Sequence, residues 1–349
     1  MALTLQFSGR MKNPNYRRAR PEYSQQIRRV FQIGFLGLNV WICIEFYRWV
    51  RFFEAGGGGL APTRPPGVEG WLPIASLMNL KVFLLTGQLP ELHPAGVFLL
   101  IAFLSMSWLL RKSFCSWLCP VGTISEYLWV WGKKLFRKNW RIPRAGDIAL
   151  RSLKYILMGL FLYAVGSMSV EGIKSFLGGP YGVVADVKML NFFRFIGVSG
   201  AIVMAVLVAG SVLVQNFWCR YLCPYGALFG LFSKLSPLQI KREADLCIDC
   251  AKCAKACPSA LAVDTLITIS SVECTGCMRC VTSCPAEGAL HMSIAGSRAK
   301  VPVWIYAAGV AAIFVGVYAY ARVTGHWYTD LPQRIFSDLV PRANEFTHP

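Results

Sequence analysis

One cysteine spacing occurs twice between residues 247 and 285, and it constrains the chain more than any other feature. Each copy has the order C-x2-C-x2-C-x3-C-P, a run that holds iron–sulfur clusters in proteins. Three thiolates of a run wrap one face of a cubane, and the fourth points away from it. The fourth cysteine of each run is therefore expected to bind the other cluster. The first predicted set is Cys247, Cys250, Cys253 and Cys284, and the second is Cys274, Cys277, Cys280 and Cys257.

Packing, disulfides and zinc are the other uses for such cysteines. Neither packing nor a disulfide framework requires one spacing to occur twice with each run closed by Pro258 or Pro285. Zinc is the stronger rival, because paired C-x2-C motifs hold zinc, but it leaves Cys257 and Cys284 without a role. We therefore expect a small α+β bacterial-type ferredoxin domain with two [4Fe-4S] clusters.

The apolar composition places the rest of the chain in a membrane. Of its 349 residues, 55% are hydrophobic, and the mean hydropathy is +0.45. A net charge of +18 is compatible with nucleic acid binding, but in an apolar chain such an excess is typical of cytoplasmic loops. Of the thirteen cysteines only Cys43 lies outside an ordered motif, and we expect it to be a small buried hydrophobe.

Five apolar segments are candidates for crossing the bilayer, and the charges between them set their direction. Residues 1–29 carry seven Lys or Arg against one Glu, and residues 111–154 carry ten basic residues against two acidic ones. Both segments, and with them the ferredoxin region, are therefore expected on the cytoplasmic side. The predicted spans are 30–50, 94–110, 153–170, 195–216 and 301–321.

The predicted fold is thus a predominantly α-helical, multi-pass protein of the bacterial inner membrane, with about five spans and a ferredoxin domain on its cytoplasmic face. The apolar stretch Trp71–Leu85 is short and contains Pro73 and Lys81, so we expect an interfacial or re-entrant segment. The predicted parts are a basic arm (1–29), a membrane domain (30–236), a ferredoxin domain (237–296), and a fifth transmembrane helix with a periplasmic tail (297–349).

A second pair of matching sequences lies at the cytoplasmic ends of the second and fourth spans. FCSWLCPVG contains Cys115 and Cys119, and WCRYLCPYG contains Cys219 and Cys223. The repetition predicts a duplicated two-helix hairpin. Residues four apart share a helix face, and each proline is expected to end or bend its helix. The four thiols could form a third iron–sulfur centre or bind another metal; redox-active thiols, a transient disulfide and helix packing are the alternatives.

These motifs together resemble the membrane polyferredoxins, which include NapH, the carboxy-terminal part of NosR, the RdxA/CcoG proteins and YccM-like electron transport proteins. The resemblance covers about residues 30–295. It implies that the eight ferredoxin cysteines carry two [4Fe-4S] clusters. NapH-like members are implicated in passing quinol electrons to periplasmic reductases, and CcoG-like members are linked to copper handling. The large FMN-binding domain of NosR is missing here, so no flavin is expected.

Our functional hypothesis is a membrane redox protein that relays electrons between the quinone pool, or a membrane or periplasmic partner protein, and the two clusters. Whether it acts as a quinol dehydrogenase or as an electron-transfer subunit of an oxidoreductase is left open. The alternative is a CcoG-type factor that reduces copper or assists oxidase assembly, since thiolates suit Cu(I). A quinol site would need an ionisable group near the outer loops, where Lys81, Asp186 and Lys188 are the candidates.

Overall fold

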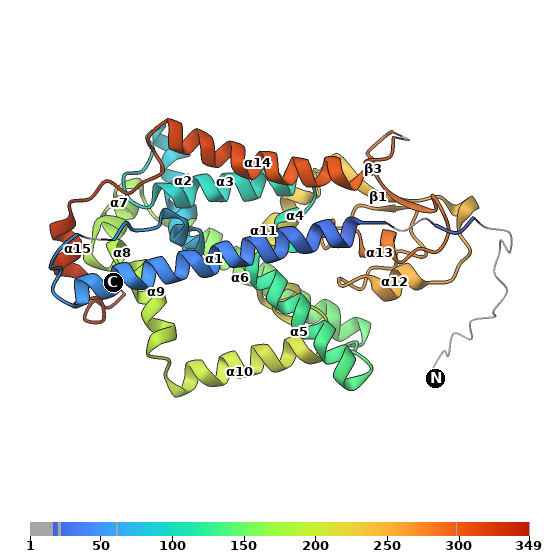
Figure 1. Ribbon diagram of the computed structural model, residues 1–349, viewed down its shortest axis with the longest axis horizontal. Helices are drawn as coiled ribbons and strands as arrows, with labels where there is room; N and C mark the ends of the chain where they lie inside the picture. Colours follow the sequence, from blue (N-terminus) through green and yellow to red (C-terminus); the bar gives the residue numbers. More distant parts are fainter. Residues whose placement is uncertain (1–16, 20–21, 61, 298, 349) are drawn as a thin grey trace.

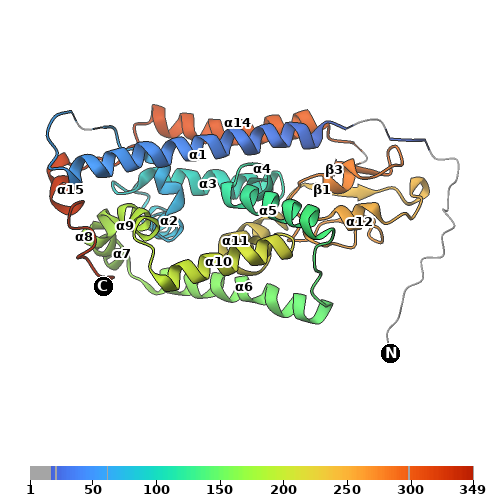
Figure 2. The same ribbon diagram turned by 60° about the horizontal axis from the view of Figure 1, so that its bottom comes forward.

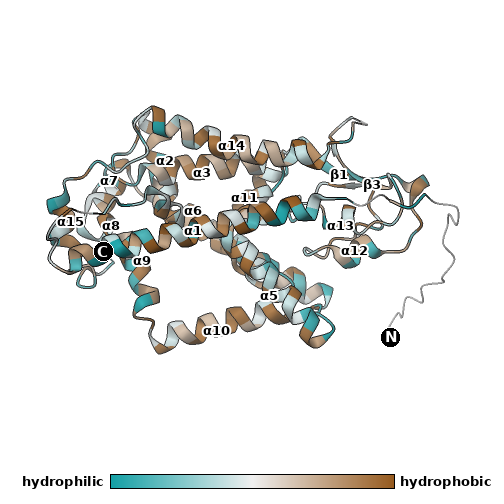
Figure 3. Ribbon diagram, in the orientation of Figure 1, coloured by the Kyte–Doolittle hydropathy of each residue, from teal (hydrophilic) through white to brown (hydrophobic). Residues whose placement is uncertain are grey.

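The structure is a computed structural model that describes residues 17–19, 22–60, 62–297 and 299–348. Long helices run along its longest axis, the cysteine-rich region occupies one end, and the short helices near the C-terminus occupy the other (Figures 1 and 2). Apolar residues dominate α3, α10 and α14, whereas hydrophilic residues gather toward the ends (Figure 3). This distribution is typical of a helical domain that spans a membrane.

Most of the helices belong to the part that precedes the cysteine-rich region. In chain order they are α1 (Ser24–Glu54), η1 (Pro66–Trp71), α2 (Pro73–Thr86), α3 (Pro94–Leu109), α4 (Ser113–Trp117), α5 (Pro120–Phe136), α6 (Arg144–Ser167), α7 (Val170–Gly178), α8 (Pro180–Val183), α9 (Ala185–Arg194), α10 (Val198–Leu213), η2 (Trp218–Leu222) and α11 (Pro224–Ser233). Two more helices follow the cysteine-rich region, α14 (Val303–Val323) and α15 (Gln333–Leu339).

Within the described residues, three helices are long and apolar enough to cross a membrane, namely α1, α6 and α14. The pair α9 and α10 passes the same test only together, and it is bent by 82°. Up to four spans therefore follow from length and composition. Helix α1 begins at Ser24, before the predicted start near Val30, and its Cys43 is exposed rather than buried as expected.

Helix α3, the predicted second span, is the central helix of the bundle. Its 16 residues correspond to a length of about 24 Å, which is less than the thickness of a bilayer core. It is buried along most of its length and packs against α2, α11, α14 and η1. The apolar character of α3 therefore serves protein packing as well as any contact with lipid.

The cysteine-rich region forms a small α+β unit. Its elements are β1 (Leu238–Arg242), η3 (Ala244–Leu246), α12 (Lys252–Ala256), β2 (Thr268–Ile269), α13 (Arg279–Thr282) and β3 (Leu290–Ile294). The three strands form an antiparallel sheet in the order β2-β1-β3, with Ile240 of β1 opposite both Ile269 and Met292. The side chains of these three residues are buried, so the sheet packs one face inward.

This α+β unit is joined to the helices by one continuous apolar core. Phe103 of α3, Phe114 of α4 and Phe229 of α11 belong to the same buried cluster as Ile240 and Cys280. Residues 17–19 also pair with the chain just after Cys284, where the amide of Ala19 donates to the carbonyl oxygen of Pro285 at 2.9 Å. The unit therefore packs directly on the helices through a shared core.

Candidate iron–sulfur centres and the adjoining cavity

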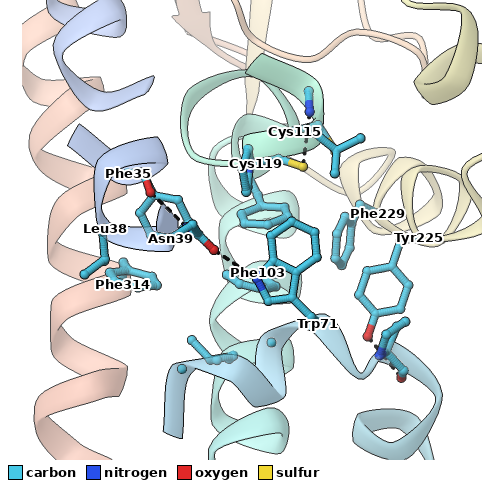
Figure 4. A pocket seen from close by; sticks show the side chains of 18 of the residues that line it. Phe35, Leu38, Asn39, Trp71, Phe103, Cys115, Cys119, Tyr225, Phe229 and Phe314 are labelled. Carbon is cyan, nitrogen blue, oxygen red and sulfur yellow. Dashed lines mark hydrogen bonds between the residues drawn. The ribbon is translucent and has the colours of Figure 1, made fainter. Parts of the chain in front are cut away.

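The four cysteines of the C-x3-C-P motifs lie together at one large cavity. Cys115, Cys119, Cys219 and Cys223 all line it, and its volume is about 890 Å³. Their side chains come from α4, the start of α5, η2 and the start of α11, which are distant in sequence. Aromatic side chains such as Trp71, Phe103 and Tyr225 surround the cavity beneath Cys115 and Cys119 (Figure 4).

Neither motif is the single helix that we expected: Cys115 lies on an α-helical turn and Cys219 on a π-helical turn, and in both motifs a second helix begins after the second cysteine. As expected, the helix that carries the first cysteine ends before the proline, and Pro120 and Pro224 each occupy the first turn of a new helix, where the missing N–H costs nothing. Cys119 and Cys223 are consequently N-cap residues. The amide of Gly122 donates to the Cys119 sulfur at 3.4 Å, and the amide of Gly226 donates to the Cys223 sulfur at 3.3 Å.

These amide contacts favour thiolates, whereas the apolar surroundings oppose free ones. Burial raises the pKa of all four thiols, and that of Cys119 to about 11. An uncoordinated thiol at this site is therefore a poor nucleophile. A bound metal would deprotonate the thiols, and the helix N-termini would then stabilise the resulting negative charge.

The ferredoxin cysteines line two further, separate cavities, and each cavity draws on both sequence runs. One is lined by Cys247, Cys250, Cys253 and Cys284, and the other by Cys274, Cys277, Cys280 and Cys257. Cys257, from the first run, thus lies with three cysteines of the second run, and Cys284, from the second run, lies with three cysteines of the first. A zinc site would have left these two cysteines without a role. Within the described part of the chain, no three His, Cys, Asp or Glu side chains surround the position of a single metal ion.

The backbone repeats itself around these two cavities. Asp249 and Ala251 have φ of 54°, and Gly276 and Met278, at the equivalent positions of the second run, have φ of 63° and 56°. The left-handed region is unfavourable for three of these four residue types, so the loops accept local strain to keep the same curved path. A curved loop whose cysteines line a cavity is suited to binding a cubane cluster.

The cavity of the C-x3-C-P cysteines adjoins the second ferredoxin cavity directly, because Cys277 lines both. Helix α4 forms the contact. The hydroxyl of Ser116 donates to the carbonyl oxygen of Thr275 at 2.7 Å, and the indole of Trp117 donates to that of Gly276 at 3.3 Å. The four C-x3-C-P cysteines and the second ferredoxin set are thus direct neighbours.

At its other end the cavity reaches the segment before α2, where Arg64 and Trp71 line it. The Arg64 guanidinium pairs with Asp186 at 2.7 Å and with Glu69 at 2.8 Å, and the ring of His93 lies 3.6 Å from Glu69. Burial alone would raise the pKa of Glu69, but Arg64 and His93 lower it to about 2. This buried ionic network fixes η1 against α9 and the N-terminus of α3.

The other two ionisable candidates have structural contacts away from this network. The ammonium of Lys81 donates to the carbonyl oxygens of Val165, Gly166 and Met168 at the end of α6. The ammonium of Lys188 donates to carbonyl oxygens in the chain after α15. Of the three candidates, only Asp186 belongs to a network that lines the cavity, through Arg64.

Two family models match the chain. A 4Fe-4S binding domain matches residues 92–143 and 196–243, and a 4Fe-4S dicluster domain matches residues 239–285. YccM of Escherichia coli (strain K12), whose name provisionally assigns it to electron transport, is 46% identical over 326 residues, which cover 92% of this chain and 91% of YccM. The chain belongs to the membrane polyferredoxin family.

More distant relatives share part of this polyferredoxin. The ferredoxin-type protein NapH of Haemophilus influenzae is 27% identical over 54% of this chain and 62% of NapH. The regulatory protein NosR of Pseudomonas aeruginosa is 29% identical over 54% of this chain and 27% of NosR. No solved structure matches the chain. With its apolar helices, the polyferredoxin is a membrane protein that binds iron–sulfur clusters and belongs to electron transport.

The polyferredoxin also has a buried charged group that we did not predict from the sequence. Lys112, Lys154 and Glu273 lie between the C-x3-C-P cysteines and the loop that carries Cys274. Burial alone would raise the pKa of Glu273, but the two lysines lower it to about 2. In the sequence these lysines are two of ten basic residues between 111 and 154, so nothing in composition distinguishes them. The one available signal was that Lys112 lies three residues before Cys115.

Proposed function

We propose that this polyferredoxin relays electrons between the quinone pool, or a membrane or periplasmic partner protein, and two [4Fe-4S] clusters in its ferredoxin domain. The observation that carries the proposal is the cavity of about 890 Å³, which is lined by Arg64 and Trp71 at one end and by the four C-x3-C-P cysteines at the other. Cys277 extends this path into the ferredoxin domain. Each cluster would accept and pass on one electron at a time.

The four C-x3-C-P cysteines hold a third iron–sulfur centre in this proposal. Their convergence on one cavity supports it, as does the match of one 4Fe-4S binding model to both hairpin ends. The double match also supports a duplicated hairpin. The raised pKa of the buried thiols disfavours the alternatives in which they act as free redox thiols.

A quinol is the proposed donor at the cavity. The cavity walls are mainly apolar, including Leu38, Ile42 and Phe314, and the exposed Leu38 and Trp41 of α1 give it an edge toward lipid. Oxidation of one quinol releases two electrons and two protons. The electrons would pass singly to the neighbouring centre, the carboxylate of Glu45, which lines the cavity, would accept one proton, and the other proton would pass to water at the exposed edge of the cavity.

The proposed orientation places the ferredoxin domain on the cytoplasmic face of a bacterial inner membrane, with five spans. The basic segment 111–154 lies at the ferredoxin end of the bundle, which supports this orientation. Helix α3 counts as a span if α4 and the loops around it complete the crossing. The proposed parts remain 1–29, 30–236, 237–296 and 297–349; residues 1–16 and 20–21 lie outside the described residues.

The test is an anaerobic titration of the purified protein, followed by EPR, with a quinol analogue and separately with Cu(II). We expect the quinol analogue to reduce the clusters in single-electron steps, and we expect Cu(II) to leave the oxidised protein unchanged. Copper bound at the four C-x3-C-P cysteines, without any cluster reduction by quinol, would favour the CcoG-type assembly role instead.

A further inference from the structure

Three segments carry the motif cysteines, and Lys112 belongs to one of them and contacts the other two. It lies three residues before Cys115 in the first C-x3-C-P segment. Its ammonium donates to the carbonyl oxygen of Gly226 in the second segment and to that of Val272 in the ferredoxin domain, each at 3.2 Å. Only 4% of Lys112 is exposed, and it lines the same cavity as the four cysteines.

The carboxylate nearest to Lys112 is that of Glu273, and its main ion-pair partner is another lysine, Lys154. Both oxygens of Glu273 lie 2.7 Å from the ammonium of Lys154, and the hydroxyl of Tyr155 donates to one of them at 3.0 Å. Lys112 is farther from this carboxylate, at 3.9 Å. Arg111, which is also buried, donates to the carbonyl oxygens of Ser233 and Ser271. The buried region beside the cysteines therefore holds more positive than negative charge.

The position of Lys112 is charged in one half of the repeat only, and Arg220, which follows Cys219 in the other half, is paired with Asp147 at 2.7 Å. When the two C-x3-C-P segments are aligned on their cysteines, Lys112 corresponds to Asn216, which is neutral. The single ammonium reaches across to Gly226, in the turn that follows Cys223. A cluster held by four thiolates is anionic, and its negative charge grows when it is reduced, so one fixed cation beside it can serve both halves.

We propose that Lys112 is a positioning residue that raises the reduction potential of the centre held by Cys115, Cys119, Cys219 and Cys223, an inference that rests on the proposed third centre. The step adds one electron to that centre and moves no proton. In a buried region of low dielectric constant, the ammonium stabilises the added negative charge far more than it would in water. The centre thereby becomes a better acceptor for electrons that enter from the cavity.

The test is a redox titration of the full-length protein, monitored by EPR, with Lys112→Met, Lys112→Arg and the control Lys81→Met. The control removes a lysine that also donates to backbone carbonyl oxygens, but far from the cysteines. We expect Lys112→Met to make reduction of the third centre at least about tenfold less favourable, which corresponds to about 59 mV for one electron. Lys112→Arg and Lys81→Met should keep the wild-type potential.

Two outcomes overturn the inference in distinguishable ways. A third EPR signal whose potential is the same in Lys112→Met and in the wild type contradicts the role of Lys112 alone. Absence of a third signal from the wild type contradicts the proposed centre and the role together. If Lys112→Met loses iron, Lys112→Gln takes its place, because its amide can still donate to Gly226 or Val272; an unshifted potential in that variant contradicts the inference.

Discussion

Arg28 of α1 and Glu126 of α5 form a bidentate ion pair, with nitrogen–oxygen distances of 2.6 and 2.5 Å. Arg279 of α13 adds a third contact to the same carboxylate at 2.9 Å. One carboxylate, which is 16% exposed, thus joins two helices of the membrane domain to the ferredoxin domain. Since Cys280 follows Arg279 directly, this contact helps to fix the second cysteine set against the bundle.

Glu126→Gln should destabilise the folded protein, because it leaves the buried Arg28 without its charged partner. Loss of one member of a buried ion pair costs about 3 to 5 kcal/mol. Thermal unfolding in detergent, monitored by tryptophan fluorescence, measures the change. Asp338→Asn is the control, since Asp338 and Arg342 form an exposed pair that solvent screens. Equal unfolding temperatures for the two variants would contradict the role of Glu126.

The crossed arrangement of the ferredoxin cysteines makes a specific prediction. Cys253→Ala and Cys284→Ala should remove the same EPR signal, although the two residues belong to different sequence runs, because both line one cavity. Cys257→Ala should instead remove the signal that depends on Cys274, Cys277 and Cys280. If Cys284→Ala removed the same signal as Cys280→Ala, each cluster would be held by a single run and the assignment would be wrong.

Two glycines at equivalent positions of the C-x3-C-P motifs should respond differently to alanine. A Cβ atom at Gly122 would overlap the carbonyl oxygen of Cys115, whereas one at Gly226 would lie 3.5 Å from that of Cys219, an ordinary contact. We expect Gly122→Ala to lower the iron content of the purified protein and Gly226→Ala to keep it. A normal iron content in Gly122→Ala would show that α4 can move away from α5 without loss of the site.

Leu38→Trp should obstruct the proposed quinol site, because Leu38 lines the cavity at its exposed edge. Steady-state reduction by a quinol analogue should show a KM raised severalfold, while dithionite still reduces all clusters. Val40→Trp is the matched control, since Val40 lies on the same helix and is exposed but does not line the cavity. Unchanged kinetics in Leu38→Trp would place the quinol elsewhere.

The sequence could predict what depends on local spacing. The cysteines of each ferredoxin run lie close together in a short loop, so their spacing predicted the two sets that line the two cavities. The apolar segments likewise predicted the long helices α1, α6 and α14. The two C-x3-C-P motifs predicted four thiols in one place, which the structure shows at a single cavity.

Tertiary packing decided the features that the sequence did not indicate. The first helix extends back to Ser24 because Arg28 and Gln32 bind Glu126, a contact between distant residues. Hydropathy alone does not give the number of spans, because α9 and α10 are bent by 82° relative to each other and because the apolar α3 is buried in the centre of the bundle. Lys112 could not be distinguished from the other basic residues of segment 111–154 until its contacts with Gly226 and Val272 were seen.

The most direct test of the account is anaerobic iron and sulfide quantitation, combined with EPR, for the wild type and for Cys115→Ala. We predict about twelve iron atoms per chain in the wild type, from three [4Fe-4S] clusters, and about eight in Cys115→Ala. The variant should retain both ferredoxin signals but lose reduction by the quinol analogue. An iron content of about eight in both proteins, with unchanged quinol reduction, would contradict a third centre in the relay.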